Sequence, residues 1–365
     1  MKHSLRPFPS HTPPPISRTQ LIKELMAFAT PSYKRGLFVV ARDLLLYWAL
    51  LAVIVFVPAF GWKVLASALL GLRMTSMYTL AHDASHSALV PGKRANWVIA
   101  LLLGVPTFQN FRLWTHHHNQ IHHPRTNGDH FDFYTPLSKA QYDALPAYRQ
   151  WLERVYRSPN VLGLLLYWLI EWIPGRLRPT ASTPQKHRVL AWRYASLTVC
   201  FHACLLGALA WSSTFAPVTW LTAVTLGWVV PVLLHFLISS ASLYLMHTHP
   251  KLPWFKGDIQ RTGDYAPELC SIVLTTPDWF SKMVNNVYCH AAHHAVHRVP
   301  TYNLLDAQVR MNELLGNRLV VEPLSPALVL RTLRTCKLYD YDKHQWLDFA
   351  GNPSAPPINL AARGA

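Results

Sequence analysis

Long apolar runs dominate the pattern of hydrophobic and polar positions along this chain. Four of them are about as long as the roughly 20-residue helix that crosses a bilayer, and they lie at residues 44–60, 62–81, 194–211 and 218–246. A short bend follows the first run, around residues 61–64, and another separates the last two runs, at 212–217. We therefore expect an all-α, polytopic membrane protein whose four transmembrane helices form two hairpins.

The rest of the chain is more polar. Two weaker apolar segments, at residues 98–108 and 161–173, are too short to span and predict interfacial or buried helices. Arg73 lies in the second span, where its charge is costly in lipid, so this side of the helix should face protein or a cavity. We expect a helical cap built from the two segments outside the spans, 82–190 and 247–315.

The distribution of charge gives an orientation. The chain has 34 Lys and Arg against 18 Asp and Glu, a net charge of +16, although charged residues make up only 14% of it. Lys63 is the only basic residue in the two bends. The positive-inside rule therefore predicts that both termini and the cap face the cytoplasm. Nothing but this charge favours nucleic acid as a partner, and we expect none; anionic membrane lipid is the simpler partner.

Cysteine usage and the N-terminus agree with this orientation. The five Cys residues are odd in number and include no Cys-x-x-Cys pair, which disfavours a disulfide framework and fits a reducing compartment. The first 35 residues contain no apolar signal core, so the first span should direct insertion. We divide the chain into an N-terminal cytoplasmic arm (1–36), a main domain (37–315) and a C-terminal cytoplasmic tail (316–365).

Twenty His residues are present, and many of them are clustered. Three short boxes share the spacing of helical neighbours, and they are His82-Asp-Ala-Ser-His86, His118-Asn-Gln-Ile-His122-His123 and His290-Ala-Ala-His293-His294. On an α-helix, residues i and i+4 share a face. His82 and His86 should therefore bind at one site, as should His118 with His122 and His290 with His294. The doubled His points about 100° further round the helix and lets one helix reach a second metal.

The chemistry of eight imidazoles favours a dinuclear metal site. Imidazole binds Zn, Cu, Fe and Ni, but the set is too large for one zinc and has no copper-like Cys or Met pattern. Two irons held by neutral imidazoles would be strongly oxidising and could activate dioxygen to break an unactivated C–H bond. A His-rich metal transporter and ordinary helix-surface His remain alternatives, although a transporter would carry its ligands near the bilayer midplane.

These boxes resemble those of the membrane fatty acid desaturase family, particularly its Δ12 (omega-6) acyl-lipid branch. The resemblance covers about residues 75–310 and includes Trp114 before the second box, the segment 126–129 after it, the segment 244–250 with its His-Thr-His-Pro, and 300–302 after the third box. It implies a diiron enzyme that uses O2 and two electrons to introduce a cis double bond into an acyl chain. A hydroxylase, acetylenase or ketolase on the same scaffold stays an alternative.

The resemblance also implies a ligand set. It consists of His82, His86, His118, His122, His123, His290, His293 and His294, with His247 as a ninth ligand. His247 directly follows the fourth apolar run, whereas His235 lies deeper in that run and His249 precedes a proline, so we expect neither of these two to bind metal. Candidates to orient the ligands from behind are Asp83, Asp129, Asp264 and Asn286, together with its neighbour Asn285.

The sequence departs from the Δ12 pattern in two places. The second box has three residues between its first His and the pair, where the branch usually has two, and the third box continues into Ala-Val-His297 instead of an apolar-Phe-Pro segment. The chain has no haem-binding or Fe–S motif and no nucleotide-binding turn. We therefore expect an external electron donor, a ferredoxin or a cytochrome b5-type protein. The resemblance implies an acyl-lipid or acyl-thioester substrate. We expect the protein in a bacterial inner membrane rather than in the endoplasmic reticulum.

Overall fold

The computed structural model describes residues 16–129, 133–181, 183–257 and 266–360, and most of them are helical. Four helical segments are long and apolar enough to cross a membrane. They are α2 (Tyr33–Phe56), α3 (Phe60–Ser85), α10 (Gln185–Ser212) and the continuous segment Trp220–His247, which joins α11 (Trp220–Val224), the π-helical turn η5 (Thr225–Val229) and α12 (Val230–His247). Among the described residues, the number of helices that could cross a membrane thus agrees with the four predicted spans.

The ends of these helices follow from local chemistry. The hydroxyl of Ser32 caps α2, which ends where Val57 turns to extended backbone before a proline. The first helix begins eleven residues before the predicted apolar run because it includes Arg42 and Asp43, whose charges are paired inside the protein. The third, α10, likewise starts earlier than predicted, directly after Pro184.

Helix α3 lies at the centre of the long helices, where it packs against α2, α12 and α4 (Lys93–Gly104). Its most apolar window is 72% buried, against 33–39% for the corresponding windows of the other three. A Cβ at Gly71 would lie 2.9 Å from both Leu234 Cβ and the Pro231 carbonyl oxygen, so glycine permits the close approach of α3 and α12. Arg73 is buried and paired, which confirms that this side of α3 faces protein.

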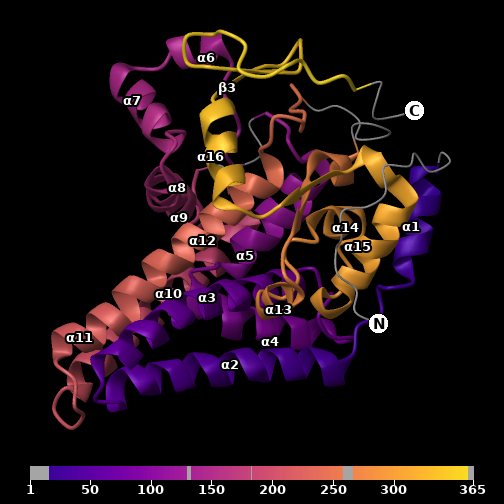
Figure 1. The fold of residues 1–365 in the computed structure, drawn as a ribbon. Coiled ribbons are helices and arrows are strands. Elements are labelled where there is room, and N and C mark those ends of the chain that lie inside the picture. Colours follow the sequence, from indigo (N-terminus) through magenta and orange to yellow (C-terminus); the bar gives the residue numbers. More distant parts are fainter. Residues whose placement is uncertain (1–15, 130–132, 182, 258–265, 361–365) are drawn as a thin grey trace.

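The remaining elements gather at one end of the long helices, toward the top and right of Figure 1. The segment that leads to and includes the second box comprises η1 (Val105–Thr107), α5 (Phe111–Trp114), the π-helix η2 (Thr115–His122) and η3 (His123–Arg125). The segment after it comprises α6 (Lys139–Asp143), α7 (Ala147–Tyr156), α8 (Val161–Tyr167), the π-helix η4 (Trp168–Trp172) and α9 (Ile173–Leu177).

The C-terminal third adds α13 to α16 and four short strands. In order they are η7 (Pro267–Cys270), β1 (Ile272–Thr275), α13 (Asp278–Met283), α14 (His290–Ala295), α15 (Thr301–Leu315), η8 (Gly316–Arg318), β2 (Val320–Pro323), α16 (Pro326–Thr335), β3 (Leu338–Asp340) and β4 (Gln345–Leu347). β1 pairs in parallel with β2, from Ile272 opposite Val320, and β3 pairs antiparallel with β4.

Helix α14, which carries the third box, is enclosed by a core of its own. It packs against η7, β1, α15 and α1 (Arg18–Met26), and Figure 1 shows α1, α14 and α15 together at the right. The backbone N–H of Ala292 also donates to the side chain of Gln308 on α15 at 2.9 Å. These contacts hold α14 among α1 and the elements of the C-terminal third.

Residues beyond 315 pack onto the chain just after α12. The indole N–H of Trp346 donates to the His249 carbonyl at 3.0 Å, and the Trp254 backbone N–H donates to the Tyr339 hydroxyl at 3.2 Å. All three aromatic side chains, Trp254, Tyr339 and Trp346, are completely buried. The C-terminal strands therefore cover the segment that follows His247.

Candidate metal centre

The three His boxes and His247 meet at the end of the long helices where the shorter elements gather. His82 lies in the last turn of α3, and His86 caps that helix. His247 is the last residue of α12, and α14 begins at His290. The second box lies on η2 and η3. The structure brings all nine predicted His residues together and divides them into two groups, each with ligand atoms within 4.8 Å of one another.

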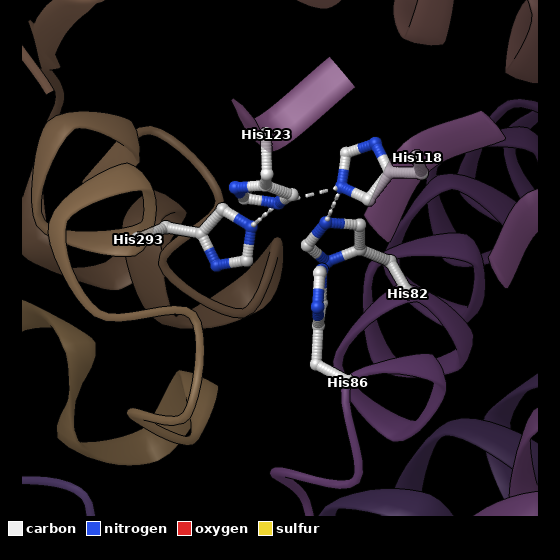
Figure 2. A group of neighbouring side chains, drawn as sticks. All are labelled: His82, His86, His118, His123 and His293. Atoms are coloured by element: carbon white, nitrogen blue, oxygen red, sulfur yellow. Dashed lines mark hydrogen bonds between the residues drawn. The ribbon is translucent and has the colours of Figure 1, made fainter. Parts of the chain in front are cut away.

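The first group contains five side chains, shown in Figure 2: His82, His86, His118, His123 and His293. The His118 Nε2 atom lies 2.8 Å from Nε2 of His82 and 3.1 Å from Nε2 of His123. The His123 Nε2 atom is also 3.2 Å from Nε2 of His293. Rings from three separate helical segments thus direct the same kind of nitrogen toward one point.

The second group contains four side chains: His122, His247, His290 and His294. The His290 Nε2 atom lies 2.8 Å from Nε2 of His247 and 3.1 Å from Nε2 of His294. The rings of His122 and His247 are 4.8 Å apart, centroid to centroid. All four side chains are buried. The end of α12 therefore contributes to the same group as the second and third boxes.

These contacts fit metal ligands better than hydrogen-bonded imidazoles. A neutral imidazole has one N–H, so a single Nε2 facing two others, as in His118 and His123, cannot satisfy both neighbours by hydrogen bonds. The buried Nε2 atom of His86 has no hydrogen-bond partner among the described residues. Two nitrogens each about 2.1 Å from one ion and about 90° apart would be roughly 3 Å from each other, which is close to the observed separations.

The second box divides between the groups differently from the α-helical prediction. We expected His118 and His122 to share one site, but His118 groups with His123, while His122 belongs to the other group. The cause is the π-helical turn, in which the backbone N–H of His123 donates to the carbonyl of His118, five residues earlier. The wider turn brings residue i+5 toward the face of residue i.

The electrostatics of the centre favour neutral rings. Burial lowers the pKa of six His side chains well below its ordinary value, and the neighbouring imidazoles lower the pKa further; these six are His86, His118, His123, His290, His293 and His294. A neutral imidazole has the free lone pair that a metal requires. These six rings are therefore in the protonation state for metal binding at neutral pH.

Polar groups behind the rings orient two of them. The Asp83 carboxylate lies 3.1 Å from Nδ1 of His82 and accepts a 2.7 Å hydrogen bond from the Thr301 backbone N–H. The Thr126 hydroxyl lies 3.2 Å from Nδ1 of His294. With Nδ1 engaged, Nε2 is the atom left for the centre. Thr126 was not among the predicted candidates, because a lone hydroxyl in a loop has no sequence signature.

The other candidates for this supporting role lie elsewhere. Asp129 accepts a 2.7 Å hydrogen bond from the Gly257 backbone N–H. Asn286 donates to the Thr301 carbonyl and accepts from Ser281. None of these three contacts is with a residue of a His box. Asp264 falls outside the described residues.

The two His residues that we expected not to bind metal lie outside both groups. His235 is completely buried within α12, with its Nδ1 atom 3.1 Å from the Thr75 hydroxyl. His249 accepts a hydrogen bond from the Lys251 backbone N–H at 3.1 Å. His297 lies beside the first group, with its ring 5.1 Å from that of His86. The sequence had marked this residue only as a departure from the Δ12 pattern.

Aromatic side chains form the wall of the centre on the side of the second box. The Trp114 ring stacks on His118 at 4.6 Å, and the Phe133 ring lies 5.5 Å from that of His122. A narrow cleft here is lined by Trp114, His117, His118, His122, Phe133, Trp172 and Arg176. It therefore borders one His from each group, and its other lining residues are three aromatic side chains, His117 and Arg176.

A buried, nine-His centre at the ends of long apolar helices defines a membrane protein with a metal centre. A sequence profile described as fatty acid desaturase matches residues 60–322. This match covers well over half of the chain, and the chain therefore belongs to the fatty acid desaturase family.

Curated relatives agree with this family. The chloroplastic omega-6 fatty acid desaturase of Spinacia oleracea is 25% identical over 336 residues, or 91% of this chain and 68% of the relative. The sn-1 oleoyl-lipid 12-desaturase of a Picosynechococcus strain is 26% identical over 77% of this chain and 78% of its own length. The sn-1 acyl-lipid omega-3 desaturase (ferredoxin) of a Nostoc strain is 24% identical, covering 78% and 77%.

The family and these relatives establish the general activity. The protein is an oxidoreductase that desaturates fatty acyl chains, and the resemblance to the Δ12 branch is confirmed. The comparisons do not favour a hydroxylase, acetylenase or ketolase, nor a metal transporter.

Proposed function

We propose that the protein is a diiron acyl-lipid desaturase that introduces a cis double bond by O2-dependent C–H activation. The observation that carries this proposal is the division of nine converging His side chains into a group of five and a group of four. Two adjacent, all-imidazole groups suit two irons, which bind imidazole readily. We assign one iron to each group, with the nine predicted His residues as ligands.

The reaction balances with an external source of electrons. A –CH2–CH2– unit loses two hydrogens to become –CH=CH–, while O2 takes up these two hydrogens together with two electrons and two protons to give two waters. The chemistry that a bound diiron centre supplies is the activation of O2 for removal of those hydrogens.

The residues of the chain hold and shield this centre. Asp83 fixes the tautomer of His82, and Thr126 contacts the outer nitrogen of His294. The aromatic wall formed by Trp114 and Phe133 keeps the surroundings of the rings apolar. We assign the approach of the acyl chain to the aromatic side of the second box, where a chain would meet one His of each group. The cleft there is only about 10 Å³ in volume, so the aromatic rings must move apart to admit a chain.

The membrane topology is part of the same proposal. We infer two helical hairpins, α2 with α3 and α10 with the segment 220–247, and a cytoplasmic cap that carries the His groups. The concentration of Lys and Arg outside the two bends supports this orientation. We retain the division into an arm (1–36), a desaturase domain (37–315) and a tail (316–365), and a bacterial inner membrane rather than the endoplasmic reticulum.

The proposed substrate is an acyl lipid rather than an acyl thioester, and the proposed donor is a ferredoxin or a cytochrome b5-type protein. The names of the cyanobacterial relatives, which specify acyl or oleoyl lipids and in one case ferredoxin, support both assignments. The basic surplus of the chain, +16, would favour an acidic donor.

Expression in a host with a simple fatty acid profile tests the proposal. We expect a new unsaturated fatty acid by gas chromatography, with its double bond located by derivatisation, and its appearance in intact lipids rather than thioesters. The matched control is His290→Ala, which should reach the membrane at the parent level and give no product. In a purified assay, turnover should require added ferredoxin or cytochrome b5; turnover with NAD(P)H alone, or a hydroxylated product, would contradict the proposal.

A further inference from the structure

A buried cluster of charges lies within the two N-terminal membrane helices, away from the His groups. The Asp43 carboxylate on α2 is completely buried and lies 2.7 Å from Nη1 of Arg73 on α3. The Ser76 hydroxyl donates to the other carboxylate oxygen at 2.6 Å, and Arg42 also contacts Asp43. Arg73 lies nine residues before His82, or about 14 Å along the helix. No residue of this cluster belongs to either His group.

The cluster is connected to the turn that precedes the third His box. The Asn285 amide nitrogen donates to Asp43 at 3.2 Å and to the Ser76 hydroxyl at 2.6 Å, while its amide oxygen accepts from Arg42 at 2.7 Å. Arg73 also reaches the Met283 carbonyl at 3.4 Å. Every polar atom of the Asn285 side chain is thus bound to α2 or α3.

The backbone of this turn needs such an anchor. Asn285 and Asn286 have φ values of 55° and 53°, two consecutive residues in the left-handed region, which Asn adopts more readily than most residues but usually one at a time. Only four residues separate Asn285 from His290, the first ligand of α14. A shift of this turn would therefore move the three His residues that α14 contributes to both groups.

A second connection returns from this turn to the first box. The Thr301 hydroxyl donates to the Asn285 carbonyl, and the Thr301 backbone N–H donates to Asp83. Asp83 in turn lies 3.1 Å from Nδ1 of His82. The polar contacts therefore run without a break from Asp43 in the membrane helices to His82 in the metal centre.

Burying these charges costs free energy that an apolar pair would avoid. Well-packed hydrophobic residues often replace a buried ion pair at no loss of stability, and intramembrane charges generally have a specific role. The contacts of Asp43 with Asn285 give it such a role, because an apolar replacement could pack the helices but could not bind the turn.

We propose that Asp43 is a positioning residue for the metal centre, which fixes the Asn285 turn and thereby the His residues of α14. This inference rests on the proposed metal-binding function. It predicts that the cluster controls metal affinity separately from the stability of the helices.

Three variants of the full-length protein in detergent test the proposal. Asp43→Leu removes the carboxylate, and Asp43→Leu/Arg73→Leu also removes the buried guanidinium that would be left unpaired; Arg42, which is partly exposed, stays in both. Asn285→Gly deletes the amide but tolerates the left-handed backbone. We expect each of them to weaken Fe(II) binding by about tenfold or more, the effect of losing a group that orients a ligand, in a titration against a competing chelator.

Lys63→Met is the matched control. Lys63 is a second buried charge on α3, but it donates to the Ile54 carbonyl near the opposite end of the helix. Its loss should lower thermal stability and leave Fe(II) affinity within about twofold of the parent. This contrast separates a general loss of helix packing from a loss of positioning.

Parent-like Fe(II) affinity in the double variant or in Asn285→Gly would overturn the proposal, because the cluster would then only balance charge. The same would follow if Lys63→Met weakened binding as much as the other variants. Titrations with Co(II) in parallel distinguish this failure from that of the proposed function. A parent that binds Co(II) but not Fe(II) contradicts the iron assignment, while the comparison among variants still decides the role of Asp43.

Discussion

Replacing His247 should remove one metal site and spare the other. His247 belongs to the group of four, and its Nε2 atom lies 2.8 Å from that of His290. His247→Ala leaves three imidazoles there and all five of the other group. Loss of a group behind a ligand lowers metal affinity about 10–100-fold, so loss of a ligand itself should exceed about 100-fold, or roughly 3 kcal/mol. We expect iron to fall from about two per chain to about one, with loss of desaturation.

His235→Ala is the control in the same helix. This ring is also completely buried, but its contacts are with the hydroxyls of Thr75 and Ser239. The Thr75 hydroxyl keeps its bond to the Gly71 carbonyl in the variant. Removing the ring should leave a cavity and delete weak hydrogen bonds, which lowers the free energy of unfolding by about 1–3 kcal/mol. The iron content should stay unchanged.

The assay is iron content by mass spectrometry of metals after a timed chelator challenge, combined with thermal unfolding in detergent. Equal iron in His247→Ala and the parent would refute the assignment of His247 and leave eight ligands. Loss of iron in His235→Ala, without unfolding, would show that the division into two groups does not describe the metal site.

Three further predictions concern the surroundings of the rings. Asp83→Asn should weaken metal binding about 10–100-fold, measured by chelator competition; parent-like affinity would remove Asp83 from the support of His82. Thr126→Val should weaken binding while Thr126→Ser, which keeps the hydroxyl near His294, should not, and equal effects would exclude a role for that hydroxyl. The metal-free protein should lose stability as pH falls below about 6.5. Below that pH the His residues of the unfolded chain bind protons, whereas the buried rings of the folded protein, whose pKa is lowered, stay neutral. A melting temperature unchanged between pH 7.5 and 5.5 would contradict this.

The apolar runs predicted the four long helices well, but not where the first begins. A hydropathy pattern treats Arg42 and Asp43 as polar residues at the edge of a span. In the structure they lie within α2, because Arg73 and Asn285 pair with them from segments 30 and more than 200 residues away. Such pairing depends on the tertiary fold, and no local pattern reveals it.

The His spacing likewise predicted which residues gather, but only part of what supports them. Asp83 was a candidate because it is next to His82 in sequence, and in the structure its carboxylate lies 3.1 Å from Nδ1 of that ring. Asp129 follows His123 of the second box by six residues, and its loop pairs with Phe255, so that its carboxylate accepts a hydrogen bond from Gly257. Thr126 reaches His294 across 168 residues of chain.

The π-helical turn explains why the second and third boxes distribute their His residues between the two groups in the same way although their spacing differs. In the third box, His290 and His294 share one group and His293 joins the other. In the second box, which has one more residue, His118 and His123 share a group and His122 joins the other. The i+5 hydrogen bond of His123 absorbs the additional residue, so both boxes present two rings to one group and a third to its neighbour.

This equivalence leads to a last prediction, on deletion of a residue from each box. Deleting the exposed Gln120 should convert the π-turn into a regular α-helix, with the spacing of the third box and all its His residues kept. Deleting Ala291 from the third box should instead rotate its pair by about 100° away from His290. We expect the Gln120 deletion to retain most of its iron and the Ala291 deletion to lose it. Equal loss in both would mean that the wider turn is needed in itself, for example to hold His122 toward His247, and not simply to absorb one residue.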